Sequence, residues 1–93
     1  MIVERKLIVN NDHGLHARPA SDLVKLAQNF KSETFLFKAN DKNKKANCKS
    51  VLSILLLGAI KGTELILQGN GSDANEAINE ISNFFDRNFN EVS

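Results

Sequence analysis

The sequence predicts an α+β fold, an open-faced β-sandwich in which a four-stranded antiparallel sheet is covered on one face by three helices. Strand-like and helix-like segments follow one another in the order βαββαβα. The strand-like segments can each bury only one face, so the helices are expected together on that face. Ninety-three residues with 42% apolar content are enough for one hydrophobic core, so residues 1–93 are expected to form a single domain.

The individual elements follow from hydrophobic periodicity and from turn residues. Apolar residues at every second position predict strands, and apolar residues at i, i+3, i+4 and i+7 predict amphipathic helices. In chain order, we expect a strand at residues 3–9, a helix at 16–29, a hairpin at 35–38 and 44–48 with its turn at 40–43, a helix at 50–57, a strand at 63–68 and a helix at 73–85.

The ends of the predicted helices carry characteristic residues. Pro19 fits the first turn of a helix, because it lacks a backbone N–H that would be unpaired there. Ser50 is a preferred N-cap residue, and Gly58 is expected to stop the short helix that follows. Asp73, with Glu76 three residues later, predicts a capping box for the last helix.

The charge distribution gives no indication of a nucleic-acid partner. The formal net charge is +1, so no general attraction to nucleic acid or to an anionic membrane is expected. Lysines gather between Lys38 and Lys49, and with Phe35 and Phe37 they could form a stacking surface for RNA. We favour lysines that protect an exposed sheet edge, because the two phenylalanines lie in a strand that needs core residues.

The sequence predicts a cytoplasmic protein with no membrane insertion and no metal site. Residues 1–6 mix acidic and basic side chains where a signal peptide would be apolar. The apolar run at residues 51–60 is shorter than the ~20 residues that span a membrane. Cys48 is the one cysteine, so it is expected to be a small core residue without a disulfide. Two histidines and this cysteine give no metal-ligand spacing.

The segment Gly14–Ala20 carries His16 and Arg18 where a turn enters a helix. The first N–H groups of a helix have no intrahelical partner, and with the positive end of the helix dipole they form an anion site. The backbone amides of Ala17 and Arg18 could therefore hold a phosphate, and the Arg18 guanidinium could add a bidentate contact. A neutral His16 would offer a ring nitrogen as a nucleophile. By spacing alone, an equal alternative is that His16 only caps the helix and Arg18 is solvated.

The motif GLHARPA at residues 14–20 resembles the active-site signature of the histidine-containing phosphocarrier (HPr) family of the bacterial phosphoenolpyruvate-dependent phosphotransferase system. Residues 49–52 and 57–62 resemble the family's second signature. The resemblance implies that His16 accepts a phosphoryl group from enzyme I and passes it to enzyme IIA domains for sugar uptake, with Arg18 holding the phosphoryl group. It further implies a carrier rather than an enzyme, with no cofactor of its own.

Ser50 is a second candidate site. In HPr proteins of some bacteria, HPr kinase/phosphorylase modifies the matching serine, and the phosphorylated form signals carbon status. A phosphate on Ser50 would lie at a helix N-terminus, where an anion is well placed. A regulatory interaction module that signals through phosphorylated Ser50 is therefore an alternative function. The simplest interpretation of Ser50 is a helix cap with no further role.

The segment at residues 50–57 is apolar all round, so part of it is expected to be exposed. We expect Ile54 and Leu57 in the core, and Leu52 and Leu55 at the surface. The resemblance implies a docking surface for enzyme I and enzyme IIA that combines polar and apolar residues of two helices: Ser21, Lys25, Gln28, Val51, Leu52 and Leu55. A face that meets successive partners is most simply presented by a monomer.

Two departures from the family pattern, and the end of the chain, keep a second branch open. Ser53 stands where many HPr proteins have glycine, and His13 adds an imidazole that we expect to be an ordinary turn residue. Residues 85–91 resemble the nitrogen-related paralogue of HPr, which passes phosphate along a regulatory relay. A nitrogen-related regulatory phosphocarrier is therefore the alternative with the same chemistry.

Overall fold

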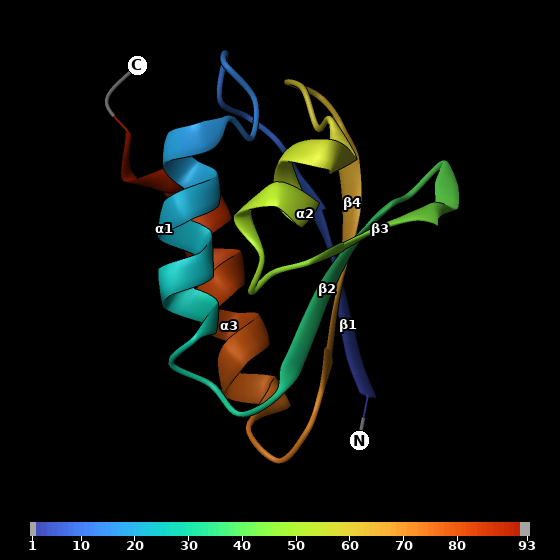
Figure 1. Cartoon of the computed structure of the whole chain (residues 1–93), viewed down its shortest axis with the longest axis vertical. Coiled ribbons are helices and arrows are strands. Elements are labelled where there is room, and N and C mark those ends of the chain that lie inside the picture. The colour runs from blue at the N-terminus through green and yellow to red at the C-terminus, as the bar shows by residue number, and fades with distance from the viewer. Residues whose placement is uncertain (1, 92–93) are drawn as a thin grey trace.

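The computed structural model describes residues 2–91, which form one four-stranded sheet with helices on one side (Figure 1). The strands are β1 (Ile2–Ile8), β2 (Glu33–Lys38), β3 (Asp41–Asn47) and β4 (Glu64–Asn70), and the helices are α1 (Ala17–Ala27), α2 (Val51–Leu57), α3 (Ala74–Asp86) and the short 3₁₀ turn η1 (Asn88–Asn90). Neighbouring strands are antiparallel, in the spatial order β1-β4-β2-β3. The predicted α+β open-faced sandwich is confirmed.

The hydrophobic core lies between the sheet and the helices. On the central strand β4, Leu65 and Leu67 are fully buried, whereas Ile66 between them is half-buried on the open face. The apolar stripe of α1 and the apolar face of α3 are buried, as expected. α3 packs on the sheet, and α1 packs beside α2 and α3. This difference between the faces follows because successive side chains of a strand point to opposite sides and only one side has a covering layer.

The hairpin between β2 and β3 turns earlier than the sequence predicts. We expected the turn at residues 40–43, but Lys38 pairs with Asp41, so residues 39–40 alone connect the strands. Polar residues such as Asp41 and Asn43 are typical of turns. Here they belong to β3, a solvated strand at one edge of the sheet. A polar edge strand cannot be distinguished from a turn until its pairing partner is known.

The two phenylalanines of β2 do not face the core, contrary to our expectation. Thr34 and Leu36 are buried, so Phe35 and Phe37 lie half-buried on the open face. Lys45 holds its Nζ atom 4.3 Å from the centre of the Phe35 ring, a cation–π contact. The physical reason is register, because a shift of one residue exchanges the two faces of a strand. The expectation that lysines line a sheet edge is confirmed for β3, one of the two edge strands.

The capping box predicted at Asp73 and Glu76 is wrong. The Asp73 carboxylate accepts the backbone N–H groups of Lys31 and Ser32, each at 2.9 Å, and also the Ser32 hydroxyl. These hydrogen bonds hold the pKa of Asp73 below its ordinary value, and the bond from the Ser32 hydroxyl has the largest effect. Donors from a distant loop have replaced the local partner, so Asp73 ties the start of α3 to the segment before β2.

Candidate functional site

His16 is the N-cap residue of α1. Its backbone is extended (φ −85°, ψ −170°), and its carbonyl accepts the N–H of Ala20 at 3.0 Å. Within residues 2–91, its side chain makes no capping hydrogen bond, so the imidazole, which is 35% exposed, is available for other contacts. The N–H groups of Ala17 and Arg18 follow in the first turn, where a helix offers them no internal acceptor. The expected combination of an imidazole with the amide end of a helix is present.

The loop before His16 is held against the segment after α2. The N–H of Leu15 donates to the carbonyl of Ala59 at 2.9 Å, and Gly14 adopts a positive φ of 68°. A Cβ atom on Gly14 would lie 2.6 Å from the Ala59 oxygen, a distance that non-bonded atoms do not tolerate. Gly14 is therefore required for the close approach that positions His16.

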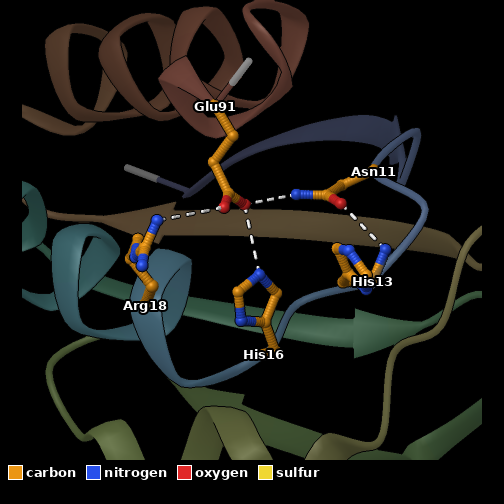
Figure 2. Close-up of polar contacts among 5 residues, drawn as sticks. All are labelled: Asn11, His13, His16, Arg18 and Glu91. Carbon is orange, nitrogen blue, oxygen red and sulfur yellow. Dashed lines mark hydrogen bonds and ion pairs between the residues drawn. The ribbon is translucent and has the colours of Figure 1, made fainter. Parts of the chain in front are cut away.

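A carboxylate from the far end of the chain faces His16. Oε1 of Glu91 lies 3.2 Å from Nε2 of His16, and Oε2 lies 4.0 Å from a guanidinium nitrogen of Arg18 (Figure 2). Asn11, which is 2% exposed, donates its side-chain N–H to the same Oε1 atom. The Glu91 side chain is 17% exposed, whereas that of Arg18 is 77% exposed. Neither Glu91 nor Asn11 was predicted from the sequence as part of the site.

The tail that carries Glu91 is anchored by a buried aromatic ring. Phe89 is 2% exposed, and its ring centre lies 5.3 Å from that of Phe84 and 4.9 Å from that of Phe85. Residues 88–90 all have positive φ, at 55°, 58° and 58°, so the chain reverses after α3 and returns to the start of α1. Asparagine adopts this conformation more readily than other non-glycine residues. The two asparagines were a sequence signal for a turn, but nothing in them indicates what the turn approaches.

His13 lies beside the site and supports Asn11. Its backbone N–H donates to Oδ1 of Asn11 at 2.8 Å, and its ring centre is 5.8 Å from that of His16, in an edge-to-face arrangement. Because Oδ1 of Asn11 accepts this bond, the amide nitrogen of Asn11 is directed toward Glu91 (Figure 2). His13 is a turn residue, as expected, and its backbone takes part in arranging the site.

Ser50 caps α2, as its residue type predicts. Its hydroxyl oxygen accepts the N–H of Ser53 at 3.2 Å. The hydroxyl of Ser53 in turn accepts the backbone N–H of Asn47 at 2.8 Å. Gly58 ends the helix, as expected, and it adopts a left-handed conformation (φ 65°).

The second helix has one core face and one exposed face. Ile54 and Leu57 are buried, and Leu52 and Leu55 are 66% and 39% exposed, as expected. Leu56, for which we made no prediction, is 73% exposed. α1 lies beside α2 (Figure 1). The residues assigned to a docking surface all reach the surface at least in part: Ser21, Lys25, Gln28, Val51, Leu52 and Leu55.

The last features of the described residues concern Cys48, metal ligands and helices long enough to span a membrane. Cys48 is fully buried, as expected of a core residue, and burial raises the pKa of its thiol to about 12. Residues 2–91 contain no group of three side chains that could hold a metal ion. Across the same residues, none of the helices has the length and apolar character needed to cross a membrane.

An open-faced sandwich with a histidine at the start of its first helix is the arrangement expected of a small phosphocarrier. The family described as "PTS HPr component phosphorylation site" matches residues 3–87 of this chain. With this match over most of its length, the chain belongs to the HPr family, the phosphocarriers of the phosphotransferase system.

Individual relatives come from both branches of the family. The chain is 37% identical to the phosphocarrier protein HPr of Xylella fastidiosa, over 97% of this chain and 98% of the relative. It is 34% identical to the phosphocarrier protein NPr of Klebsiella oxytoca, over 98% of this chain and 99% of the relative. The crystal structure of an HPr from Thermoanaerobacter tengcongensis matches the fold with a TM-score of 0.89 at 35% identity, over 98% and 99% of the two chains.

Proposed function

We propose that this protein carries phosphoryl groups on His16, which accepts them from phosphorylated enzyme I and passes them to an enzyme IIA in sugar uptake. The observation that carries the proposal is the imidazole of His16, which lies at the N-terminal end of α1 and makes no capping hydrogen bond. The lone pair of a ring nitrogen attacks phosphorus, and the electron pair of the breaking bond returns to the donor. The N–H groups of Ala17 and Arg18, with the Arg18 guanidinium, hold the phosphoryl oxygens.

Receipt of the phosphoryl group from enzyme I and its delivery to an enzyme IIA both depend on a surface that these partners can reach. We assign enzyme I and enzyme IIA to the face formed by α1 and α2, because it joins exposed apolar residues to a cationic and polar rim. Its apolar part includes Leu52 and Leu55, and its rim includes Lys25 and Gln28. The carrier acts as a cytoplasmic monomer in which residues 1–93 form one domain, and it needs no cofactor of its own.

The test is phosphorylation of the purified protein by enzyme I with magnesium and phosphoenolpyruvate. Intact mass is measured before and after mild acid, which cleaves phosphohistidine and spares phosphoserine. We expect one acid-labile phosphoryl group in the wild type and none in His16→Ala. His13→Ala is the matched control, because it removes the neighbouring imidazole and should still be phosphorylated. Normal uptake by His16→Ala would refute the proposal.

The choice between the sugar branch and the nitrogen branch concerns the acceptor. Relatives named HPr and NPr match the chain almost equally well, and the nitrogen-related carrier is therefore the alternative within this function. The phosphorylated protein can be offered an enzyme IIA from each branch in parallel. Faster discharge to the sugar-branch acceptor is expected, and faster discharge to the nitrogen-branch acceptor would replace our assignment.

Ser50 supports a second candidate function, signalling after modification by HPr kinase/phosphorylase. Its side chain is half-buried at the start of α2, beside the exposed apolar face of that helix. Incubation with the kinase and ATP should give an acid-stable phosphate that is absent from Ser50→Ala. Ser53→Ala is the matched control, since it removes the neighbouring hydroxyl.

A further inference from the structure

The contact between Glu91 and His16 joins residues 75 positions apart, and the same carboxylate lies 4.0 Å from Arg18. We infer that Glu91 is a positioning residue for phosphoryl transfer, because its carboxylate holds the Nε2–H of His16 and so orients the ring with Nδ1 free. Asn11 in turn holds the carboxylate. The inference rests on the proposed function, since it gives a role in that transfer to residues outside the histidine motif.

The carboxylate is held by a buried donor. Asn11 is 2% exposed, and its Oδ1 atom accepts the N–H of His13 at 2.8 Å. Its amide nitrogen must then point the other way, where it donates to Oε1 of Glu91. A carboxylate that is 17% exposed and fixed at one oxygen has little freedom to leave the imidazole.

The hydrogen-bonding capacity of a carboxylate decides the tautomer of His16. An ionised carboxylate can only accept, so the ring nitrogen that faces it must carry a hydrogen. Nε2 of His16 is that nitrogen, at 3.2 Å from Oε1. A neutral imidazole has one N–H, so the lone pair is then on Nδ1. Figure 2 shows this second ring nitrogen directed away from Glu91. A carboxylate that fixes the ring of a nucleophilic or ligating histidine acts in the same way in other proteins.

The backbone of the tail is strained where it delivers Glu91. Phe89 has a φ of 58°, which a bulky residue rarely adopts, and it is kept there by burial against Phe84 and Phe85. Such conformations persist only where surrounding packing holds them, and they are concentrated at functional sites. The aromatic cluster therefore acts as the anchor from which the carboxylate reaches His16.

The charges around His16 agree with a positioning role. Arg18 lies 4.0 Å from Oε2 of Glu91 and remains 77% exposed, so its guanidinium can turn to an arriving phosphoryl group. The ring of His13 packs edge-on against the imidazole. Glu91 itself lies on the Nε2 side, away from the nitrogen that would bind phosphorus. Competition between Glu91 and the phosphoryl group for Arg18 is the opposing effect, and it would make the carboxylate inhibitory.

The first experiment needs no partner protein. Nitrogen-15 NMR of the unphosphorylated chain distinguishes the two neutral tautomers of His16. We expect the Nε2–H form in the wild type. Glu91→Gln should raise the proportion of the Nδ1–H form about tenfold, because a carboxamide can donate as well as accept and a charge-assisted bond is lost. Glu80→Gln, an equal change of charge on the exposed side of α3, should leave the ratio unchanged. An unaltered ratio in Glu91→Gln would overturn the inference.

The second experiment measures transfer. Phosphoryl uptake from enzyme I should slow about tenfold in Glu91→Gln and stay normal in Glu80→Gln. Asn11→Ala removes the donor that holds the carboxylate, so its tautomer ratio should change in the same direction. Equal or faster uptake by Glu91→Gln means that the carboxylate competes with phosphate, which contradicts positioning. Lack of uptake by the wild type would instead refute the proposed function, while the tautomer measurement would stand independently.

Discussion

The close approach of Gly14 to Ala59 predicts a specific loss of stability on adding one methyl group. Gly14→Ala forces a residue with a side chain into a φ of 68°, which costs about 1–2 kcal/mol. The new Cβ would also meet the Ala59 oxygen at 2.6 Å, and relief of such overpacking costs about 1–3 kcal/mol. The free energy of unfolding should therefore fall by about 2–5 kcal/mol.

Gly58→Ala is the matched control for this change. Gly58 has a φ of 65°, but a Cβ added there would meet nothing within 4 Å. It should lose only the conformational part, about 1–2 kcal/mol. Urea unfolding followed by far-UV circular dichroism measures both variants. If Gly14→Ala proved no less stable than Gly58→Ala, the argument that this contact positions the His16 loop would fail.

Three further predictions follow from burial and from hydrogen bonding. Ile54→Ala should reduce the free energy of unfolding by about 2–5 kcal/mol, because the Ile54 side chain is fully buried. Leu56→Ala should reduce it by no more than about 0.5 kcal/mol, because Leu56 is 73% exposed. Equal effects of the two substitutions in a denaturation experiment would contradict this division of α2 into a core face and an exposed face. The lowered pKa of Asp73 stabilises the fold above its ordinary value of 3.8, and this contribution is lost as pH falls through the folded-state pKa. Asp73→Asn should thus be less stable than the wild type at neutral pH, and the difference should shrink in acid; a constant difference would refute it. A rise in the pKa of Cys48 from 9.0 to about 12 lowers its thiolate fraction about a thousandfold. A thiol reagent should therefore react slowly with the native protein and rapidly after unfolding. Fast labelling of the native chain would argue against the burial of Cys48.

Local chemistry in the sequence was sufficient for the order of the elements and for several features of the helices. The helix that starts at His16, the cap at Ser50 and the two faces of α2 are all as predicted. Each depends on residues within a few positions of one another, because capping bonds and helical periodicity connect near neighbours in the chain.

Only the tertiary structure decided which distant groups meet. Glu91 reaches His16 across 75 positions through a left-handed turn and a buried ring, and no local pattern encodes that distance. Phe35 and Phe37 face the open side because pairing with β3 and β4 sets the register of β2. Because β2 has apolar residues on both faces, its own sequence does not determine which face is buried, and pairing with the neighbouring strands does. The amino-acid sequence by itself therefore indicated His16 and the helix that follows it, whereas packing at long range brought the carboxylate of Glu91 to this histidine.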